Sequence, residues 1–257
     1  MDYSAITVTV SDDIVVVAMN RPDKMNALNA LMRAELTHAF KDAPNHGRVV
    51  VLTGTGRAFC SGQDLGMGEA TKLDLERVLR DEYVPMLRAI IDCPLPTIAA
   101  VNGPAAGAGA NLALVCDVVL ASHDAYFVQA FARIGLIPDA GGTWFLPRQI
   151  GLARAMGAAL FTDKIMATQA ADWGMIYAAI PADGFDAHWR DRAAQLAQGP
   201  TETYRHIKHA MRASFDNGID AQLNLEAKLQ GKCGQTRDFR EGVVAFAEKR
   251  PPKFEGR

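Results

Sequence analysis

One carboxylate stands out in a glycine-rich stretch of the chain. Residues 134–144 read IGLIPDAGGTW, which places Asp139 on a turn of small residues beside apolar ones. Burial raises the pKa of such a carboxylate and nearby dipoles lower it, so the group can be held near the protonation state that a proton shuttle needs. We therefore take Asp139 as the candidate catalytic base. The alternative is that Asp139 only caps the N-terminus of a helix.

Two loops could supply the second part of such a site. Residues 57–65 and 103–111 each follow an apolar stretch and are rich in small side chains. Such loops allow backbone N–H groups to point at a ligand. If the two loops meet, their N–H groups would form an oxyanion hole, which stabilises a developing enolate. Tight packing of a strand against a helix would explain either loop taken alone.

Several other chemistries are disfavoured by the motifs. Residues 103–111 lack the G-x-G-x-x-G spacing, and no Gly-Lys-Ser/Thr follows them, which argues against nicotinamide binding and nucleotide hydrolysis. Ser61 lies in Phe-Cys-Ser-Gly-Gln and not in the G-x-S-x-G motif of a hydrolase. The four cysteines are widely separated and form no C-x-x-C pair, so we expect neither a metal site nor a disulfide framework.

The composition sets the broad class. The chain has 257 residues, of which 49% are hydrophobic, enough for one domain with a sizeable core. The formal net charge is −2 and the 27 Lys and Arg residues form no basic block, so we expect no nucleic-acid partner. No charged segment followed by an apolar one opens the chain, and no apolar run approaches the roughly 18 residues that span a bilayer. These features predict a cytoplasmic protein with no membrane partner.

The first third of the chain alternates between strand and helix signals. Residues 6–10 and 14–19 predict a hairpin, since β-branched residues flank a short polar turn. Asn29 is a candidate cap for a helix that reaches Lys41, and residues 49–53 predict a buried strand.

The later segments repeat the order of strand, loop and helix. Their predicted elements are a helix over 73–91 that Pro94 and Pro96 end, a strand over 97–101, an apolar segment over 111–115, and short strands over 118–121 and 126–129. Beyond Gly151 the pattern is almost wholly helical. We expect an α/β core with a C-terminal helical appendage, and no linker composition separates the two parts.

Four separated motifs carry a resemblance to a known family. They are NRPDKMNAL at 20–28, SGQD at 61–64, GAG at 107–109 and FAEKR at 246–250. In this order, and nearly end to end, the chain resembles the enoyl-CoA hydratase/isomerase (crotonase) family. The stretches GQDL, AAGAGA and GLIPDAGGTW resemble in particular the family's 2-(1,2-epoxy-1,2-dihydrophenyl)acetyl-CoA isomerases of phenylacetate catabolism.

The resemblance implies a fold, an assembly and a substrate class. The fold would be a spiral of ββα repeats over residues 1–200, with a helical trimerisation region over 201–257 in the same folded unit. The assembly would be a homotrimer or a dimer of trimers. The substrate would be an acyl-CoA thioester, with coenzyme A as part of the substrate and no separate cofactor.

The resemblance also assigns roles to residues. The backbone N–H groups of Gln63 and Ala108 would hold the thioester oxygen. Coenzyme A would be bound by Lys24, Ala27, Gly62, Asp64 and Leu65, with Lys249 reaching its phosphates from the same or a neighbouring subunit. The acyl pocket would be lined by Phe127, Phe131, Asn111 and Trp144.

Two departures from the hydratase pattern point to isomerisation. Hydratases of this family use two glutamates to position and split water, and the matching positions here are Asn111 and Phe131. Neither residue can act as a carboxylate base, which leaves Asp139 as the ionisable group. One base beside an oxyanion hole suits moving a proton between two carbons, either to shift a double bond or to open a ring epoxide.

Three alternatives remain open at this point. Enoyl-CoA hydration is the first. Dehalogenation of the kind found in 4-chlorobenzoyl-CoA dehalogenases is disfavoured, because Val84 stands where those relatives carry a histidine. A non-catalytic acyl-CoA-binding or scaffold protein on the same fold is the third, and the presence of Asp139 argues against it.

Overall fold

A six-stranded sheet forms the centre of the computed structural model, which describes residues 3–66 and 74–257. In sheet order the strands are β1 (Ile6–Ser11), β2 (Ile14–Met19), β3 (Val49–Gly54), β4 (Thr97–Val101), β6 (Val118–Ser122) and β9 (Ala178–Ile180). Strands β1 and β2 are antiparallel, and every other neighbouring pair in this sheet is parallel. Because parallel strands need crossover connections, the chain passes through a helix or loop between successive strands.

A second, smaller sheet stands beside the first. Its order is β5 (Ala105–Ala106), β7 (Tyr126–Val128) and β8 (Ile165–Met166). Two isolated bridges, Leu28 with Gln63 and Cys60 with Ala105, join the loops that leave the main sheet. The carboxyl ends of β3 and β4 therefore feed into neighbouring loops that are themselves paired.

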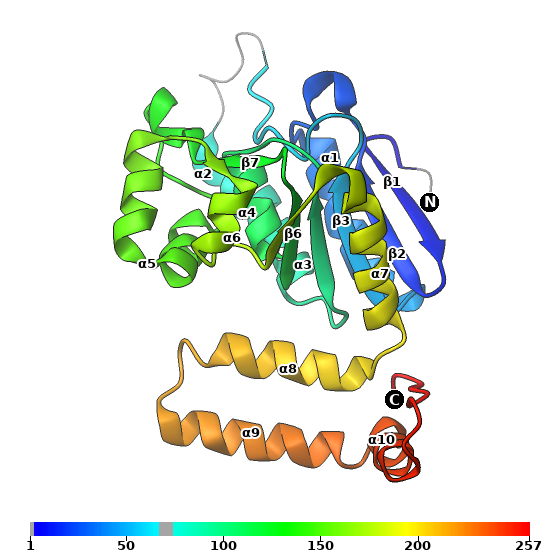
Figure 1. Cartoon of the computed structure of the whole chain (residues 1–257). Helices are drawn as coiled ribbons and strands as arrows, with labels where there is room; N and C mark the ends of the chain where they lie inside the picture. The colour runs from blue at the N-terminus through cyan, green and yellow to red at the C-terminus, as the bar shows by residue number, and fades with distance from the viewer. Residues whose placement is uncertain (1–2, 67–73) are drawn as a thin grey trace.

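Helices cover both faces of the main sheet (Figure 1). The α-helices are α1 (Ala30–Asp42), α2 (Leu75–Val78), α3 (Val84–Ile91), α4 (Ala108–Val115), α5 (Gly142–Phe161), α6 (Ala167–Asp172), α7 (Phe185–Ala197), α8 (Thr201–Ala213), α9 (Ile219–Cys233) and α10 (Arg237–Glu248). Alternate residues of β3 separate two cores: Val50 and Leu52 pack in the larger one, with α1, α3 and α4, and Val51 packs in the smaller one, under α7. Burial on both faces explains why β3 is apolar throughout.

The last three helices form an arm below the core in Figure 1. Asp117, just before β6, forms salt bridges with Lys208 (2.7 Å) and Arg212 (2.8 Å) of α8, and it accepts hydrogen bonds from the backbone N–H and hydroxyl of Thr97. Lys208 further donates to the carbonyl oxygen of Leu95. This shared, mostly buried carboxylate fixes α8 to the sheet. Among residues 3–66 and 74–257, no helix is long and apolar enough to cross a bilayer.

Most of the predicted elements are confirmed. The structure is α/β with C-terminal helices, and the first hairpin turns at Asp12 and Asp13, whose φ values of 51° and 61° match a two-residue hairpin turn. The side chain of Asn29 caps α1 by accepting from the N–H of Met32 (2.9 Å). The helix predicted over 73–91 begins at Leu75, after the N-cap residue Asp74, and the predicted first residue, 73, lies outside the described residues.

Two details of the later segments differ from the predictions. The helix itself ends at Ile91 as predicted, shortly before Pro94 and Pro96. The apolar segment over 111–115 forms most of α4, which begins at Ala108. The region beyond Gly151 is mostly helical, as predicted, but it also contains β8 and β9, which were not predicted. These strands have two and three residues, too few for an alternating pattern to appear.

Candidate active site

The two predicted loops run side by side. The N–H of Ala106 donates to the carbonyl oxygen of Cys60 (2.9 Å), and the N–H of Phe59 donates to that of Pro104 (3.1 Å). A Cβ atom on Gly62 would lie 2.8 Å from the carbonyl oxygen of Ala106 and 3.4 Å from the backbone nitrogen of Ala108. The loops are thus as close as two backbones can pack.

Two N–H groups on these loops have no acceptors among the described residues. Leu28 donates to Gly62 (2.8 Å) and accepts from Asp64 (3.1 Å), so the peptide N–H of Gln63 between them points to the opposite side. Ala108 is the first residue of α4, where an N–H has no intrahelical partner. The structure therefore brings the two predicted oxyanion donors onto adjacent loops with both N–H groups available.

Glycine is required at two of these positions. Gly62 has a φ of 93°, which side-chain-bearing residues rarely adopt, and its Cα faces the neighbouring loop. A Cβ on Gly109 would lie only 2.3 Å from the carbonyl oxygen of Cys60. The glycine-rich composition thus reflects close backbone packing, which places the two N–H groups on adjacent loops.

Asp139 lies on a tight turn that leads into α5. Ala140 and Gly141 both have positive φ values (49° and 85°), and the carbonyl oxygen of Asp139 accepts from the N–H of Gly142 (2.8 Å). The N-cap residue of α5 is Gly141, and no side chain caps this helix. The interpretation of Asp139 as a helix cap is therefore wrong.

The Asp139 carboxylate is partly buried. Its Oδ1 atom is buried and has no hydrogen-bond donor in the described part of the chain. Burial, with no opposing contribution from a nearby cation, raises the pKa of Asp139 from 3.8 to about 6. A carboxylate with such a pKa is ionised at neutral pH yet binds a proton readily, as proton transfer requires.

Asn111 fastens this turn to the helix that begins at Ala108. The side chain is fully buried, its Nδ2 donates to the carbonyl oxygen of Asp139 (2.7 Å), and its Oδ1 accepts from Nε2 of Gln129 (2.8 Å). Both ends of the amide are therefore occupied. The predicted pocket residue Asn111 thus supports the Asp139 turn, and Gln129, which was not among the predicted site residues, holds Asn111 in place.

The three predicted pocket aromatics lie in different places. Phe131 is almost buried, and its ring would be 3.7 Å from a Cβ atom on Gly107, beside the second loop. Phe127 is fully buried in the core on β7. Trp144 is 36% exposed, stacks on Arg148 and meets the edge of Phe215. It lines a cleft of about 1170 Å³ between the core and α8. Only Phe131 lies next to the predicted oxyanion donors.

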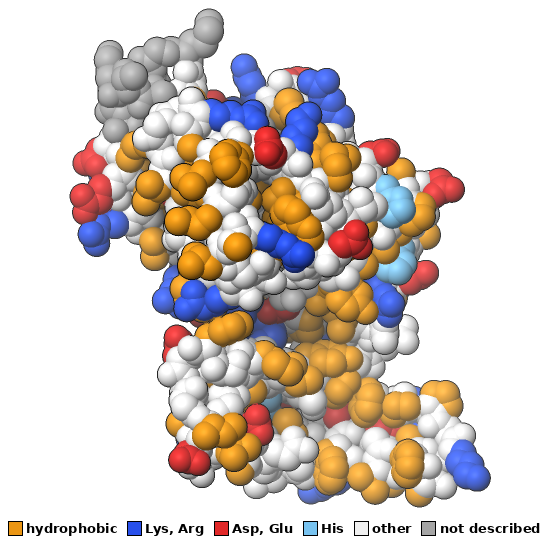
Figure 2. Space-filling model, turned by 60° about the vertical axis from the view of Figure 1, so that its left-hand side comes forward, with side chains coloured by type: hydrophobic (Ala, Val, Ile, Leu, Met, Phe, Trp, Pro, Cys, Tyr) orange, Lys and Arg blue, Asp and Glu red, His pale blue; other side chains and the backbone are white. Residues whose placement is uncertain are grey.

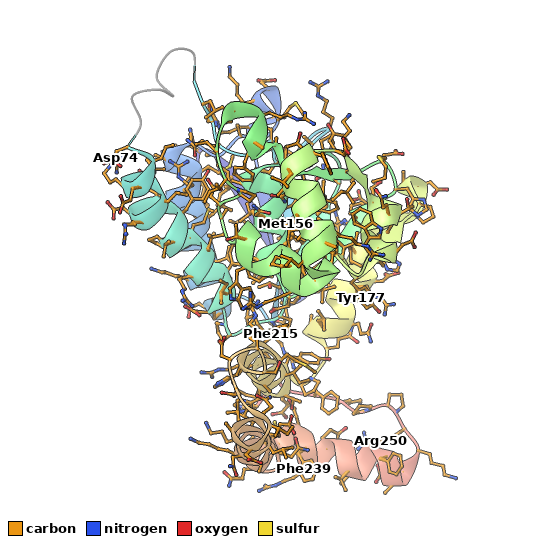
Figure 3. The ribbon with its side chains drawn as sticks, turned by 90° about the vertical axis from the view of Figure 1, so that its left-hand side faces the viewer. Asp74, Met156, Tyr177, Phe215, Phe239 and Arg250 are labelled. Carbon is orange, nitrogen blue, oxygen red and sulfur yellow. The ribbon has the colours of Figure 1, made fainter. Side chains whose placement is uncertain are left out.

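The predicted coenzyme A residues form one group, with a single exception. The segment around Lys24 and Ala27 lies against the first loop, because the N–H of Ser61 donates to the carbonyl oxygen of Met25 (3.0 Å). Gly62, Asp64 and Leu65 continue this loop. Lys249 ends α10, at the far end of the arm, and its neighbour Arg250 is labelled there in Figure 3. Within one chain, Lys249 does not join the group.

Two side chains near Gln63 were missed from the sequence. Arg33 and Tyr83 both donate hydrogen bonds to its side-chain oxygen. One signal was available: Arg33 lies between Met32 and Leu36 on the apolar side of a predicted helix, where a charge is unexpected unless it has a partner.

Comparison with known proteins agrees with this arrangement. The sequence profile described as enoyl-CoA hydratase/isomerase matches residues 9–257. A protein of Rhodobacter capsulatus described as a probable enoyl-CoA hydratase is 60% identical over all of both chains. The 1,2-epoxyphenylacetyl-CoA isomerase of Escherichia coli is 42% identical over 96% of this chain and 97% of its own.

A solved structure shares the whole fold. That structure, of an enoyl-CoA hydratase subunit from Geobacillus kaustophilus HTA426, superposes with a TM-score of 0.93 at 32% identity and covers 100% of both chains. The profile match and the relatives extend over both paired loops, the Asp139 turn and the helical arm. The chain belongs to the enoyl-CoA hydratase/isomerase family.

Proposed function

We propose that this protein is a CoA-thioester isomerase in which Asp139 carries the proton. The proposal is based on the presence, in the described part of the chain, of a partly buried carboxylate without a hydrogen-bond donor and of two backbone N–H groups without acceptors on adjacent loops. Asn111 ties these parts together, since it lies one helical turn after Ala108 and holds the carbonyl oxygen of Asp139. Enolate chemistry requires a base and hydrogen-bond donors that stabilise the negative charge on the thioester oxygen.

The proposed reaction is a proton transfer within one substrate. The thioester oxygen accepts hydrogen bonds from the N–H groups of Gln63 and Ala108. The Asp139 carboxylate removes a proton from the carbon next to the thioester, and the electron pair moves onto the oxygen as an enolate. For a 3-enoyl thioester, the same carboxyl group returns the proton two carbons further along as the double bond shifts. Proton removal and return balance, so coenzyme A within the substrate is the only cofactor needed.

Hydration is the competing activity, because one of the relatives is described as a probable hydratase. Water addition needs a second group to orient the nucleophile. Asn111, at one of the two positions where hydratases carry glutamate, already uses both ends of its amide within the protein. Phe131, at the other position, cannot titrate. Isomerisation fits these side chains better, with an enoyl chain or a ring epoxide as the acyl group.

A CoA-thioester panel separates these activities. It should contain 3-enoyl, 2-enoyl and ring-1,2-epoxyphenylacetyl thioesters, with products identified by mass and by ultraviolet absorbance. We expect double-bond shift or epoxide opening to exceed hydration. Hydration of 2-enoyl thioesters as the dominant reaction would overturn the proposal, and binding without turnover would favour a scaffold role.

We further propose that the arm mediates assembly into a homotrimer or a dimer of trimers. Apolar side chains remain exposed along α8–α10: Ile207, Met211, Phe215, Ile219, Leu223, Phe239, Val243, Val244 and Phe246. Figure 2 shows hydrophobic side chains gathered along the arm and on the core face turned toward the viewer, and Figure 3 shows Phe215 where the arm meets the core. Exposed apolar surface of this extent is typical of protein interfaces.

Replacing Asp139 with asparagine tests the proposed base. Asp139→Asn keeps the size and the backbone turn and removes the titrating group. We expect turnover to fall by about 100-fold or more, with acyl-CoA affinity nearly unchanged, because the two N–H groups remain. Exchange of the substrate α-proton with deuterated solvent should stop as well. The exposed Asp172→Asn variant is the control, and more than about a tenth of wild-type turnover in Asp139→Asn would assign the proton to another residue.

The pKa of Asp139 predicts two pH dependences. The base must be ionised, so kcat/KM should fall about tenfold per pH unit below about 6. Since burial raises this pKa, the folded state holds a proton between pH 3.8 and about 6 that the unfolded state has released. The stability of the wild type relative to Asp139→Asn should therefore decrease as pH rises through this window. If kcat/KM instead began to fall only below about pH 4, Asp139 would not have the pKa that burial gives it here.

A charge on the arm should disrupt the proposed assembly. Phe246 of α10 is 87% exposed, and Phe246→Asp would place a carboxylate in the proposed interface. Light scattering coupled to size exclusion should show a trimer or hexamer for the wild type and a smaller species for the variant. The exposed Gln195→Asp on α7 serves as the control. A wild-type monomer at micromolar concentration would refute the assembly.

A further inference from the structure

A buried arginine, Arg33, forms hydrogen bonds with Gln63 of the first loop (residues 57–65) and with the neighbouring segment. Arg33 on α1 is only 3% exposed, between apolar neighbours that pack in the core. Its Nη1 donates both to the carbonyl oxygen of Leu28 (2.8 Å) and to Oε1 of Gln63 (2.9 Å). The carbonyl oxygen of Leu28 also accepts from the N–H of Asp64 (3.1 Å). Arg33 therefore contacts the Gln63 side chain directly, and it shares the Leu28 carbonyl oxygen with the N–H of Asp64, the residue after Gln63.

The charge of Arg33 is balanced by a residue from another helix. Nε and Nη2 of Arg33 donate to Oε2 of Glu82, at 3.2 and 2.5 Å. The ion pair lowers the pKa of Glu82, so the carboxylate stays ionised. A buried guanidinium is tolerated when paired and fully hydrogen-bonded, and its planar fork fixes the geometry of its partners.

A π-helical turn brings Glu82 and its neighbour to the same place. The segment Leu79–Tyr83 winds as a π-helix between α2 and α3. The hydroxyl of Tyr83 donates to Oε1 of Gln63 (2.6 Å), and Cζ of Arg33 lies 4.8 Å from the centre of the Tyr83 ring. Single π turns inside α-helices are frequent at functional sites. Here the turn directs two consecutive side chains to Arg33.

The Gln63 side chain is consequently fixed at both of its polar atoms. Oε1 accepts from Arg33 and Tyr83, and Nε2 donates to the carbonyl oxygen of Asp64 (3.1 Å). Burial keeps the Tyr83 hydroxyl protonated by raising its pKa, and the Asp139 carboxylate acts in the same direction. Tyr83 thus lies within electrostatic reach of the proposed base while it holds the residue of the proposed oxyanion donor.

We infer that Arg33 and Tyr83 are positioning residues that hold the peptide N–H of Gln63 at the thioester oxygen. Neither residue touches the substrate in this account, which rests on the proposed oxyanion hole. A preorganised donor is effective only if it does not rotate away when charge develops, and a displacement of about 1 Å can cost about 100-fold in rate. The side-chain clamp on Gln63 supplies this rigidity.

The carbonyl stretch of a bound thioester reports the clamp directly. The probes are hexanoyl-CoA and phenylacetyl-CoA labelled with ¹³C at the thioester carbonyl, which have no double bond to shift. In the wild type, infrared difference spectra should show the band move to lower frequency on binding. In Tyr83→Phe and Arg33→Met we expect at least about half of this displacement to be lost, with kcat lower by about 10- to 100-fold and the probe Kd changed by less than about threefold.

Two further variants separate positioning from stability. Arg33→Lys keeps a charge opposite Glu82, but one ammonium cannot contact Leu28, Gln63 and Glu82 together, so the band displacement should not recover. Arg48→Met is the matched control, since Arg48 also joins distant segments, through Thr201 and the carbonyl oxygen of Gly199, away from the two loops. It should lower stability and leave the band unchanged.

Each outcome has a separate meaning. Folded Tyr83→Phe and Arg33→Met variants with the wild-type band position and turnover would overturn the positioning role. If Arg33→Met does not fold, Tyr83→Phe decides, because it removes one oxygen atom only. A wild-type protein that binds neither probe, or binds without displacing the band, would instead overturn the proposed oxyanion hole.

Discussion

The close packing of two backbone loops is the constraint on which the candidate site depends. Gly62 and Gly109 have no room for a Cβ atom, because the opposite loop lies within 2.8 and 2.3 Å of where it would stand. The loops pair through bonds such as that from the N–H of Ala106 to the carbonyl oxygen of Cys60, and the separate bridge to Leu28 turns the N–H of Gln63 to the side opposite Leu28. The start of α4 then leaves the N–H of Ala108 free on the adjacent loop. Two donors result from local backbone geometry, with no side chain involved.

Side chains add the rigidity that these donors need, and each one spans separate elements. Asn111 connects the Asp139 turn to α4. Gln129, the residue after β7, donates a hydrogen bond to the Asn111 side chain. Arg33 and Tyr83 connect α1 and the π turn to Gln63. Burying a carboxylate without a donor destabilises the folded chain, and the same burial raises the pKa of Asp139 to about 6. Burial of Asp139 is therefore the cause both of the raised pKa that the proposed chemistry uses and of a local loss of folding stability.

Local signals in the sequence were enough for the outline of the site. The composition of the loops around Gly62 and Gly107 predicts exposed N–H groups, and the turn around Asp139 predicts a carboxylate in apolar surroundings. The residues that brace them could not be found this way, since Arg33 lies 30 positions before Gln63 and Tyr83 lies 20 positions after it. Strand β9 was missed because three residues carry no pattern, and it joins the sheet only through pairing with β6. The helix-cap alternative for Asp139 was settled by the fold, which places Gly141 at the cap.

The most direct test of the central claim is a crystal structure with hexanoyl-CoA or phenylacetyl-CoA bound. The account predicts that the thioester oxygen lies about 2.7–3.1 Å from the backbone nitrogens of both Gln63 and Ala108. It also predicts a carboxylate oxygen of Asp139 within about 3.5 Å of the carbon next to the thioester. A thioester oxygen bound elsewhere, or an Asp139 carboxylate turned away from that carbon, would contradict it.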